Sequence, residues 1–114
     1  MNATSHTEKQ SIYIGIDPGK DGALVAIDSD GKIKASFMTG RDFTMTIGKG
    51  SKREYMVSRM AYALKCLGGH SNIKLAVIEK QSARPGQGVT STFSTGYGYG
   101  LWVGVLSANG IPFV

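Results

Sequence analysis

The chain has 114 residues, 13 Lys and Arg against 8 Asp and Glu, and a formal net charge of +5. This length suits one domain and is too short for two, and a 41% share of hydrophobic residues argues against a disordered protein. A single cysteine excludes an internal disulfide framework and a cysteine-based zinc site. The basic balance fits a polyanionic partner, nucleic acid first, although many small basic proteins are merely well solvated.

The N-terminal segment is expected to lie outside the folded domain. Residues 1–10 are polar and lack the apolar stretch of a secretory signal, so we expect a disordered tail followed by one domain over 11–114. No apolar run approaches the roughly 20 residues of a membrane span, which predicts no membrane association. The lone Cys66 suits a reducing compartment, and we expect a cytoplasmic protein.

Three strands are predicted first. Segment 11–17 alternates and has apolar residues on both faces, which predicts a central strand covered on both sides. Segments 22–28 and 32–38 follow, and the Asp-Gly turn between them indicates an antiparallel meander. The sequence thus begins like a mixed α/β protein.

A loop, a helix and a fourth strand come next. Residues 39–50 are polar and rich in glycine, typical of a mobile loop, and Ser51 with Glu54 matches a capping box at the start of a helix. Apolar residues then recur at helical spacing until Gly68 and Gly69. The strand predicted at 72–79 is reached through that helix, so we expect it parallel to a neighbour.

The last third is predicted to hold a polar loop at 80–88, a second helix at 89–109 and the start of a fifth strand at 111–114. A β interpretation of 96–100 stays open, because glycine alternates with tyrosine there. Gly96, Gly100 and Gly104 form a column on the helix. Each costs about 1 kcal/mol relative to alanine, so we expect another backbone, the sheet or a partner helix, to approach closely.

Two carboxylates are the strongest candidates for chemistry. Asp17 and Glu79 each end an apolar strand, and parallel pairing of those strands would bring both to the carboxyl edge of the sheet. Two acids converging there need a shared cation, for which Mg²⁺ or Mn²⁺ is suited. Asp21 and Asp28 are weaker candidates, and Asp28 is better explained by the hairpin turn. The plain alternative is that each acid merely begins a loop.

Basic and polar side chains surround this predicted edge. Lys80, Arg84 and Gln87 follow Glu79, and Lys20 lies in the loop after Asp17. Such groups contact phosphates and orient a nucleic-acid strand, so we expect them to bind DNA. Ordinary loop solvation would explain them equally well.

Two motifs carry a family resemblance. With G-I-D-P-G-K-D-G-A-L at 15–24 and V-I-E-K-Q-S-A-R-P-G-Q-G-V-T-S at 77–91, the chain resembles the RuvC family of Holliday-junction resolvases, especially its bacteriophage branch. The first motif is also similar to the opening of actin-like ATPases and sugar kinases, whereas the second is considerably more specific. The resemblance spans about nine-tenths of the chain.

The resemblance implies a ribonuclease-H-like α/β fold, with three antiparallel strands, then parallel strands, and helices on both faces. It implies a Mg²⁺-dependent endonuclease of DNA recombination and repair that nicks four-way junctions as a homodimer, without a small-molecule cofactor. Asp17 and Glu79 match the catalytic acids of the family's first and fourth strands. Gly96, Gly100 and Gly104 fall on the helix that lies at the family's dimer interface.

The resemblance also sets an expectation for the C-terminus. RuvC-like enzymes carry two further acids on a last helix, and this sequence reaches Val114 before such a helix. We therefore expect a C-terminally incomplete domain whose own nuclease activity is an open question. Two alternatives remain: a branched-DNA-binding module without catalysis, and, less favoured, the first lobe of an actin-like ATPase with a phosphate loop at 15–22.

Overall fold

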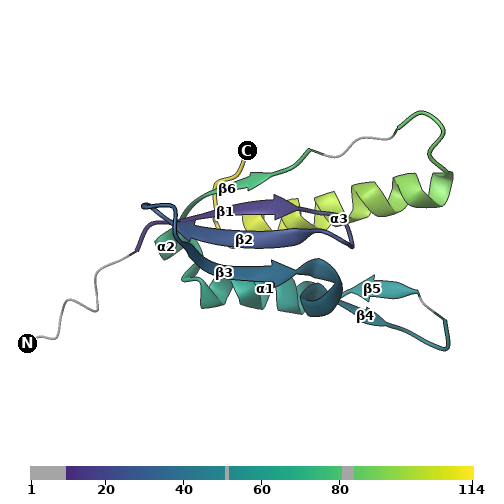
Figure 1. The fold of residues 1–114 in the computed structure, drawn as a ribbon, viewed down its shortest axis with the longest axis horizontal. Coiled ribbons are helices and arrows are strands. Elements are labelled where there is room, and N and C mark those ends of the chain that lie inside the picture. Colours follow the sequence, from purple (N-terminus) through teal and green to yellow (C-terminus); the bar gives the residue numbers. More distant parts are fainter. Residues whose placement is uncertain (1–9, 51, 81–83) are drawn as a thin grey trace, which may run out of the picture.

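The computed structural model describes residues 10–50, 52–80 and 84–114, so nearly all of the predicted N-terminal tail lies outside the described residues. Figure 1 shows the arrangement of the elements. The strands are β1 (Ile12–Asp17), β2 (Ala23–Asp28), β3 (Ile33–Met38), β4 (Thr44–Thr46), β5 (Arg53–Tyr55) and β6 (Ile73–Ile78), and the helices are α1 (Val57–Cys66), α2 (Gly69–Asn72) and α3 (Val89–Ala108).

A mixed four-stranded sheet forms the centre of the protein, in the order β3-β2-β1-β6. β1, β2 and β3 form the predicted antiparallel meander, and β6 runs parallel to β1, as expected. The C-terminal residues continue the sheet, since Ala76 N–H donates to Pro112 O and Val114 N–H donates to Ala76 O, both at 2.9 Å. The predicted fifth strand therefore begins beside β6 and parallel to it.

Asp28 forms part of the turn between β2 and β3, as predicted. Its carboxylate accepts hydrogen bonds from the backbone N–H groups of Asp30 and Lys32, each at 2.9 Å. The bond from Lys32, more than any other cause, lowers the pKa of Asp28 below its usual value. Asp28 is thus a structural residue of the hairpin.

The segment predicted as a loop at 39–50 contains regular structure. Thr39–Phe43 forms a short π-helical segment, and β4 pairs antiparallel with β5. Phe43 is buried, with ring centroids 5.4 Å from both Phe37 and Trp102. Burial of this aromatic ring fixes a segment whose polar composition favours a loop.

The prediction that Glu54 belongs to a capping box at the start of a helix is wrong. Glu54 lies in β5 rather than in the first turn of a helix, and Ser51 falls outside the described residues. α1 begins at Val57, after Met56, whose N–H donates to Phe43 O at 2.7 Å. Pairing of β5 with β4 replaces the local capping preference, because tertiary contacts override a weak local signal. The helix does end where expected, with Gly68 in the left-handed conformation at φ 99°.

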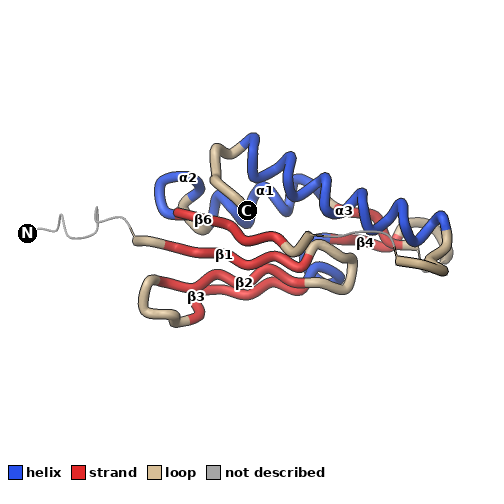
Figure 2. Tube along the Cα trace, turned by 90° about the horizontal axis from the view of Figure 1, so that it is seen from above, coloured by secondary structure: helices blue, strands red, loops and turns tan. Residues whose placement is uncertain are grey.

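Both long helices cover one face of the sheet, contrary to the prediction that both faces are covered. Figure 2 shows α1 and α3 on the same side of the strands. Their buried side chains and the inward side chains of the sheet form one core cluster. The opposite face is exposed at Tyr13 (38%) and Val77 (52%). β1 is therefore central in the sheet yet buried on one face, as its strict alternation of buried and exposed residues shows.

α3 confirms the helix that the sequence predicts over 89–109 and rules out the alternative of a strand at 96–100. Its close backbone contact is at Gly98, where an added Cβ would lie 2.5 Å from Pro18 O and even nearer the Tyr55 hydroxyl. Gly96, Gly100 and Gly104 face open space within the described structure. The column does not approach the sheet, so that part of the expectation is wrong, and the approach of a partner helix stays a prediction. Within the described part of the chain, no helix combines the length and hydropathy required to cross a membrane.

These contacts predict opposite effects for two neighbouring glycines. Gly98→Ala should destabilise the fold by about 1–3 kcal/mol, because the methyl group overlaps Pro18 O and the Tyr55 hydroxyl. Gly96→Ala should stabilise by up to about 1 kcal/mol through helix propensity. Urea unfolding at a concentration where the protein is monomeric measures both, and equal effects of the two substitutions would contradict the packing described.

Candidate functional site

Asp17 and Glu79 lie side by side at the carboxyl ends of β1 and β6. Glu79 N–H donates to Ile16 O at 2.9 Å, continuing the parallel ladder in which Ile16 faces Ile78. Adjacent strands are about 4.8 Å apart, so the two acids occupy neighbouring positions. Because Ile16 and Ile78 point into the core, alternation directs both acids away from it. The predicted convergence of these residues at one sheet edge is present.

A polar cleft of about 600 Å³ contains both acids, and we refer to it as the acid cleft. Besides Asp17 and Glu79 it is lined by Lys80, Arg84, Gln87, Ser91 and Thr95. Three of the predicted DNA-binding residues, Lys80, Arg84 and Gln87, are thus brought beside the acids. Lys20, the fourth, lines a neighbouring hollow instead.

The wall of the acid cleft is held in place by the side chain of Gln87. Its Oε1 accepts a hydrogen bond from Arg84 N–H at 2.9 Å. Its Nε2 donates to Ser91 Oγ at 2.9 Å and to Thr95 Oγ1 at 3.2 Å. Between these contacts the chain turns at Pro85-Gly86, with Gly86 at φ 83°, as a type II turn requires. Gln87 therefore fixes the loop to α3, a role that its side-chain type alone does not reveal.

The loop after β1 folds tightly around Asp17. Gly19 N–H donates to Asp17 Oδ1 at 3.3 Å, and Gly22 N–H donates to Gly19 O at 2.9 Å. A Cβ on Gly22 would overlap the Asp17 carbonyl, so glycine is required there by close approach. The G-x-D-P-G-K-D-G pattern thus positions the Asp17 carboxylate at the sheet edge.

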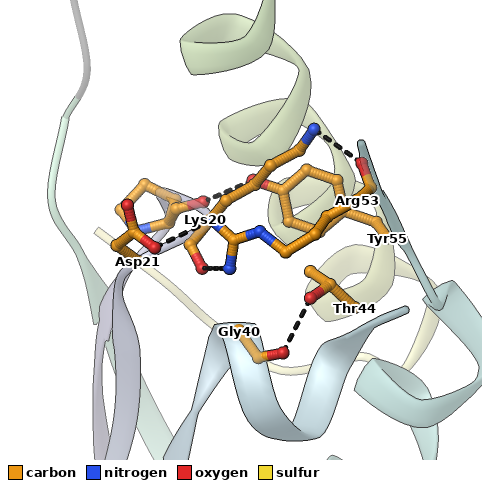
Figure 3. Close-up of polar contacts among 7 residues, drawn as sticks. Lys20, Asp21, Gly40, Thr44, Arg53 and Tyr55 are labelled. Atoms are coloured by element: carbon orange, nitrogen blue, oxygen red, sulfur yellow. Dashed lines mark hydrogen bonds and ion pairs between the residues drawn. The ribbon is translucent and has the colours of Figure 1, made fainter. Parts of the chain in front are cut away.

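Lys20 connects this loop to the β4–β5 hairpin (Figure 3). Its Nζ donates to Arg53 O at 2.8 Å and lies 5.7 Å from the centroid of the Tyr55 ring. In return, Arg53 Nη1 donates to Lys20 O at 3.3 Å, and Nη2 pairs with Asp21 Oδ1 at 2.8 Å. Lys20 and Asp21 are therefore engaged with the hairpin.

Arg53 and Tyr55 are site neighbours that the sequence reasoning missed, because it placed both at the start of a helix. The available signal was the turn-forming stretch around Gly48, at φ 74°, between two short β-prone segments. The Tyr55 hydroxyl donates to Pro18 O at 3.1 Å, and burial above all raises the pKa of Tyr55. Tyr55 thus supports the Asp17 loop where that loop meets Gly98 of α3.

The acids fit a single hard cation. Within the described residues, no group of three His, Cys, Asp or Glu side chains gathers, so Asp17 and Glu79 stand as a pair. Mg²⁺ is bound through one or two carboxylates while it keeps several waters, and an open polar cleft leaves room for those waters. The donor set is compatible with one Mg²⁺ or Mn²⁺.

Comparison with models of known protein families and with functionally curated proteins found no match.

The Gln87 contacts predict a measurable local change. Gln87→Ala removes the acceptor of the Arg84 N–H and the contacts of Gln87 with the hydroxyls of Ser91 and Thr95. Amide exchange at Arg84 should therefore accelerate about tenfold, as expected for about 1.4 kcal/mol. Hydrogen exchange followed by NMR measures this. Lys80→Ala is the matched control in the same cleft and should leave the Arg84 rate unchanged. Equal acceleration in both variants would show that Gln87 has no special role.

Proposed function

We propose that this protein is a RuvC-like member of the ribonuclease-H-like superfamily and a structure-selective endonuclease that cleaves four-way junctions and other branched DNA. The observation that carries the proposal is the pair Asp17 and Glu79 on adjacent parallel strands, in a cleft that also contains Lys80 and Arg84. The sheet supports it, since an antiparallel meander followed by a parallel strand is the arrangement the resemblance implies.

The proposed reaction is metal-dependent hydrolysis of a phosphodiester. Asp17 and Glu79 would together hold Mg²⁺, with Mn²⁺ as a substitute. When bound, the ion supplies Lewis-acid stabilisation of phosphoryl oxygens and lowers the pKa of bound water. Lys80 and Arg84 attract the phosphate and hold it against the two acids, and Gln87 keeps the Arg84 backbone in place. Asp17 is oriented by Gly19 N–H.

A homodimer is part of the proposal. Gly96, Gly100 and Gly104 are exposed on one side of α3, and a Cβ at each would meet nothing within 4 Å. A helix face without side chains lets a second helix approach closely. Two symmetric sites would then act on two strands of a four-way junction.

The acids are tested by isosteric substitution. Asp17→Asn and Glu79→Gln should each reduce Mg²⁺-dependent cleavage of a labelled four-way junction by at least about 100-fold, because the neutral amides cannot retain the cation. Junction binding in EDTA should persist, since each change removes a negative charge near the DNA. Asp30→Asn, in the β2–β3 turn, is the control and should cleave normally.

Cleavage that survives either acid substitution would disprove the site. If the unaltered protein binds junctions but cleaves none with Mg²⁺ or Mn²⁺, the binding-module alternative is correct.

The dimer is tested at the centre of the glycine column. Gly100→Leu should shift sedimentation toward monomer, because the side chain blocks helix approach, while Ser58→Leu on the exposed surface of α1 should not. An unchanged dimer in Gly100→Leu, or a monomeric unaltered protein, would place the column outside any dimer interface.

A further inference from the structure

A second hollow, of about 730 Å³, lies beside the acid cleft, between the β4–β5 hairpin and the first half of α3. We call it the hairpin groove. Its floor is the loop Gly19–Asp21, one wall is Lys52 and Arg53, and the other is formed by Thr90, Ser91, Ser94 and Thr95. In Figure 1 the hairpin and the start of α3 both extend past the carboxyl ends of β1 and β6.

The hairpin groove is positively charged. Lys20, Lys52 and Arg53 line it, and its one lining carboxylate, Asp21, is paired with Arg53 at 2.8 Å. The facing wall consists of hydroxyl-bearing residues. Cations and hydroxyls are the side chains that contact nucleic-acid phosphates, whereas serine and threonine are under-represented among the residues that contribute most to binding in protein–protein interfaces.

Two of the three cations of the groove, Lys20 and Arg53, are held by hydrogen bonds. Figure 3 shows Lys20 and Arg53 linked through each other's carbonyl groups, with Lys20 over the Tyr55 ring. Lys20 Nζ uses one proton for Arg53 O and retains two for a ligand. Thr44 Oγ1 donates to Gly40 O at 2.8 Å and joins β4 to the preceding turn. Lys20 and Arg53 are therefore positioned before a ligand binds.

The groove is continuous with the acid cleft. Ser91 and Thr95 line both, so the two hollows follow one another along the same side of α3. A polyanion bound in the acid cleft can therefore continue past Ser91 and Thr95 into the hairpin groove.

We infer that the hairpin groove binds the sugar–phosphate backbone of the nucleic-acid segment next to the one at Asp17 and Glu79. The inference rests on the proposed function for the identity of the ligand. It adds a second binding site, with Lys52, Thr90 and Ser94 as phosphate-contacting residues and the β4–β5 hairpin as the element that carries it.

The test is junction binding in EDTA, by fluorescence anisotropy of a labelled four-way junction over a range of NaCl concentrations. Lys52→Ala should weaken binding about 3–10-fold near 0.1 M salt and reduce the slope of log Kd against log salt by about one. The Lys52 carbonyl still accepts Ile47 N–H, so the hairpin bond is preserved. Lys34→Ala, which removes the same charge at the opposite end of the sheet, should change binding less than twofold.

A second variant separates lost binding from misfolding. Thr90→Glu places a carboxylate inside the groove but in the first turn of α3, where negative charge favours the helix. Binding should fall at least about tenfold while the thermal midpoint stays the same or rises. Equal effects of Lys52→Ala and Lys34→Ala, or normal binding by Thr90→Glu, would overturn the inference, as would an unaltered protein that does not bind the junction.

Cleavage measured on the same variants distinguishes the two proposals. If Lys52→Ala and Thr90→Glu bind weakly but no protein cleaves, the groove is supported and the nuclease proposal fails. If cleavage depends on Asp17 while both groove variants bind normally, the nuclease proposal holds and the groove inference is wrong.

Discussion

Parallel pairing of β1 with β6 is the constraint on which the rest of the structure depends. It aligns Ile16 with Ile78, directs both into the core and thereby turns the next residues, Asp17 and Glu79, away from it. A shift of one residue in either strand would invert every side chain of that strand and separate the acids. The same register buries the apolar residues under α1 and α3 and brings the carboxylates of Asp17 and Glu79 together. A cation between two like charges would reduce their repulsion.

α3 connects the core to the candidate site. Its second half carries Trp102 and Leu106, both fully buried, while Ser91 and Thr95 in its first half line the acid cleft and the hairpin groove. Gly98 lies between these halves, where the helix crosses the Asp17 loop at contact distance. The position of the hydroxyl-rich wall is therefore determined by packing in the core.

Much of this fold could be predicted because its strands have strong local patterns. The alternation at 11–17, the Asp-Gly turn and the helical spacing of the last third were all interpreted correctly, with bounds close to those observed. The β4–β5 hairpin was missed because three-residue strands have little pattern of their own and are held by Phe43 and Tyr55 packing against distant residues. The expectation of two covered faces failed for a related reason: apolar residues at 13 and 25 indicate a β-strand but not what lies over it.

By itself, the sequence determined the order of the main elements, the placement of Asp17 and Glu79 at strand ends and the basic character of the loops that follow these two acids. These follow from local alternation and turn chemistry, which neighbouring residues set. Tertiary structure decided the rest. It recruited Lys20 to the hairpin and created the groove beside the acids, because both depend on segments that are distant in the chain and meet only in the folded protein.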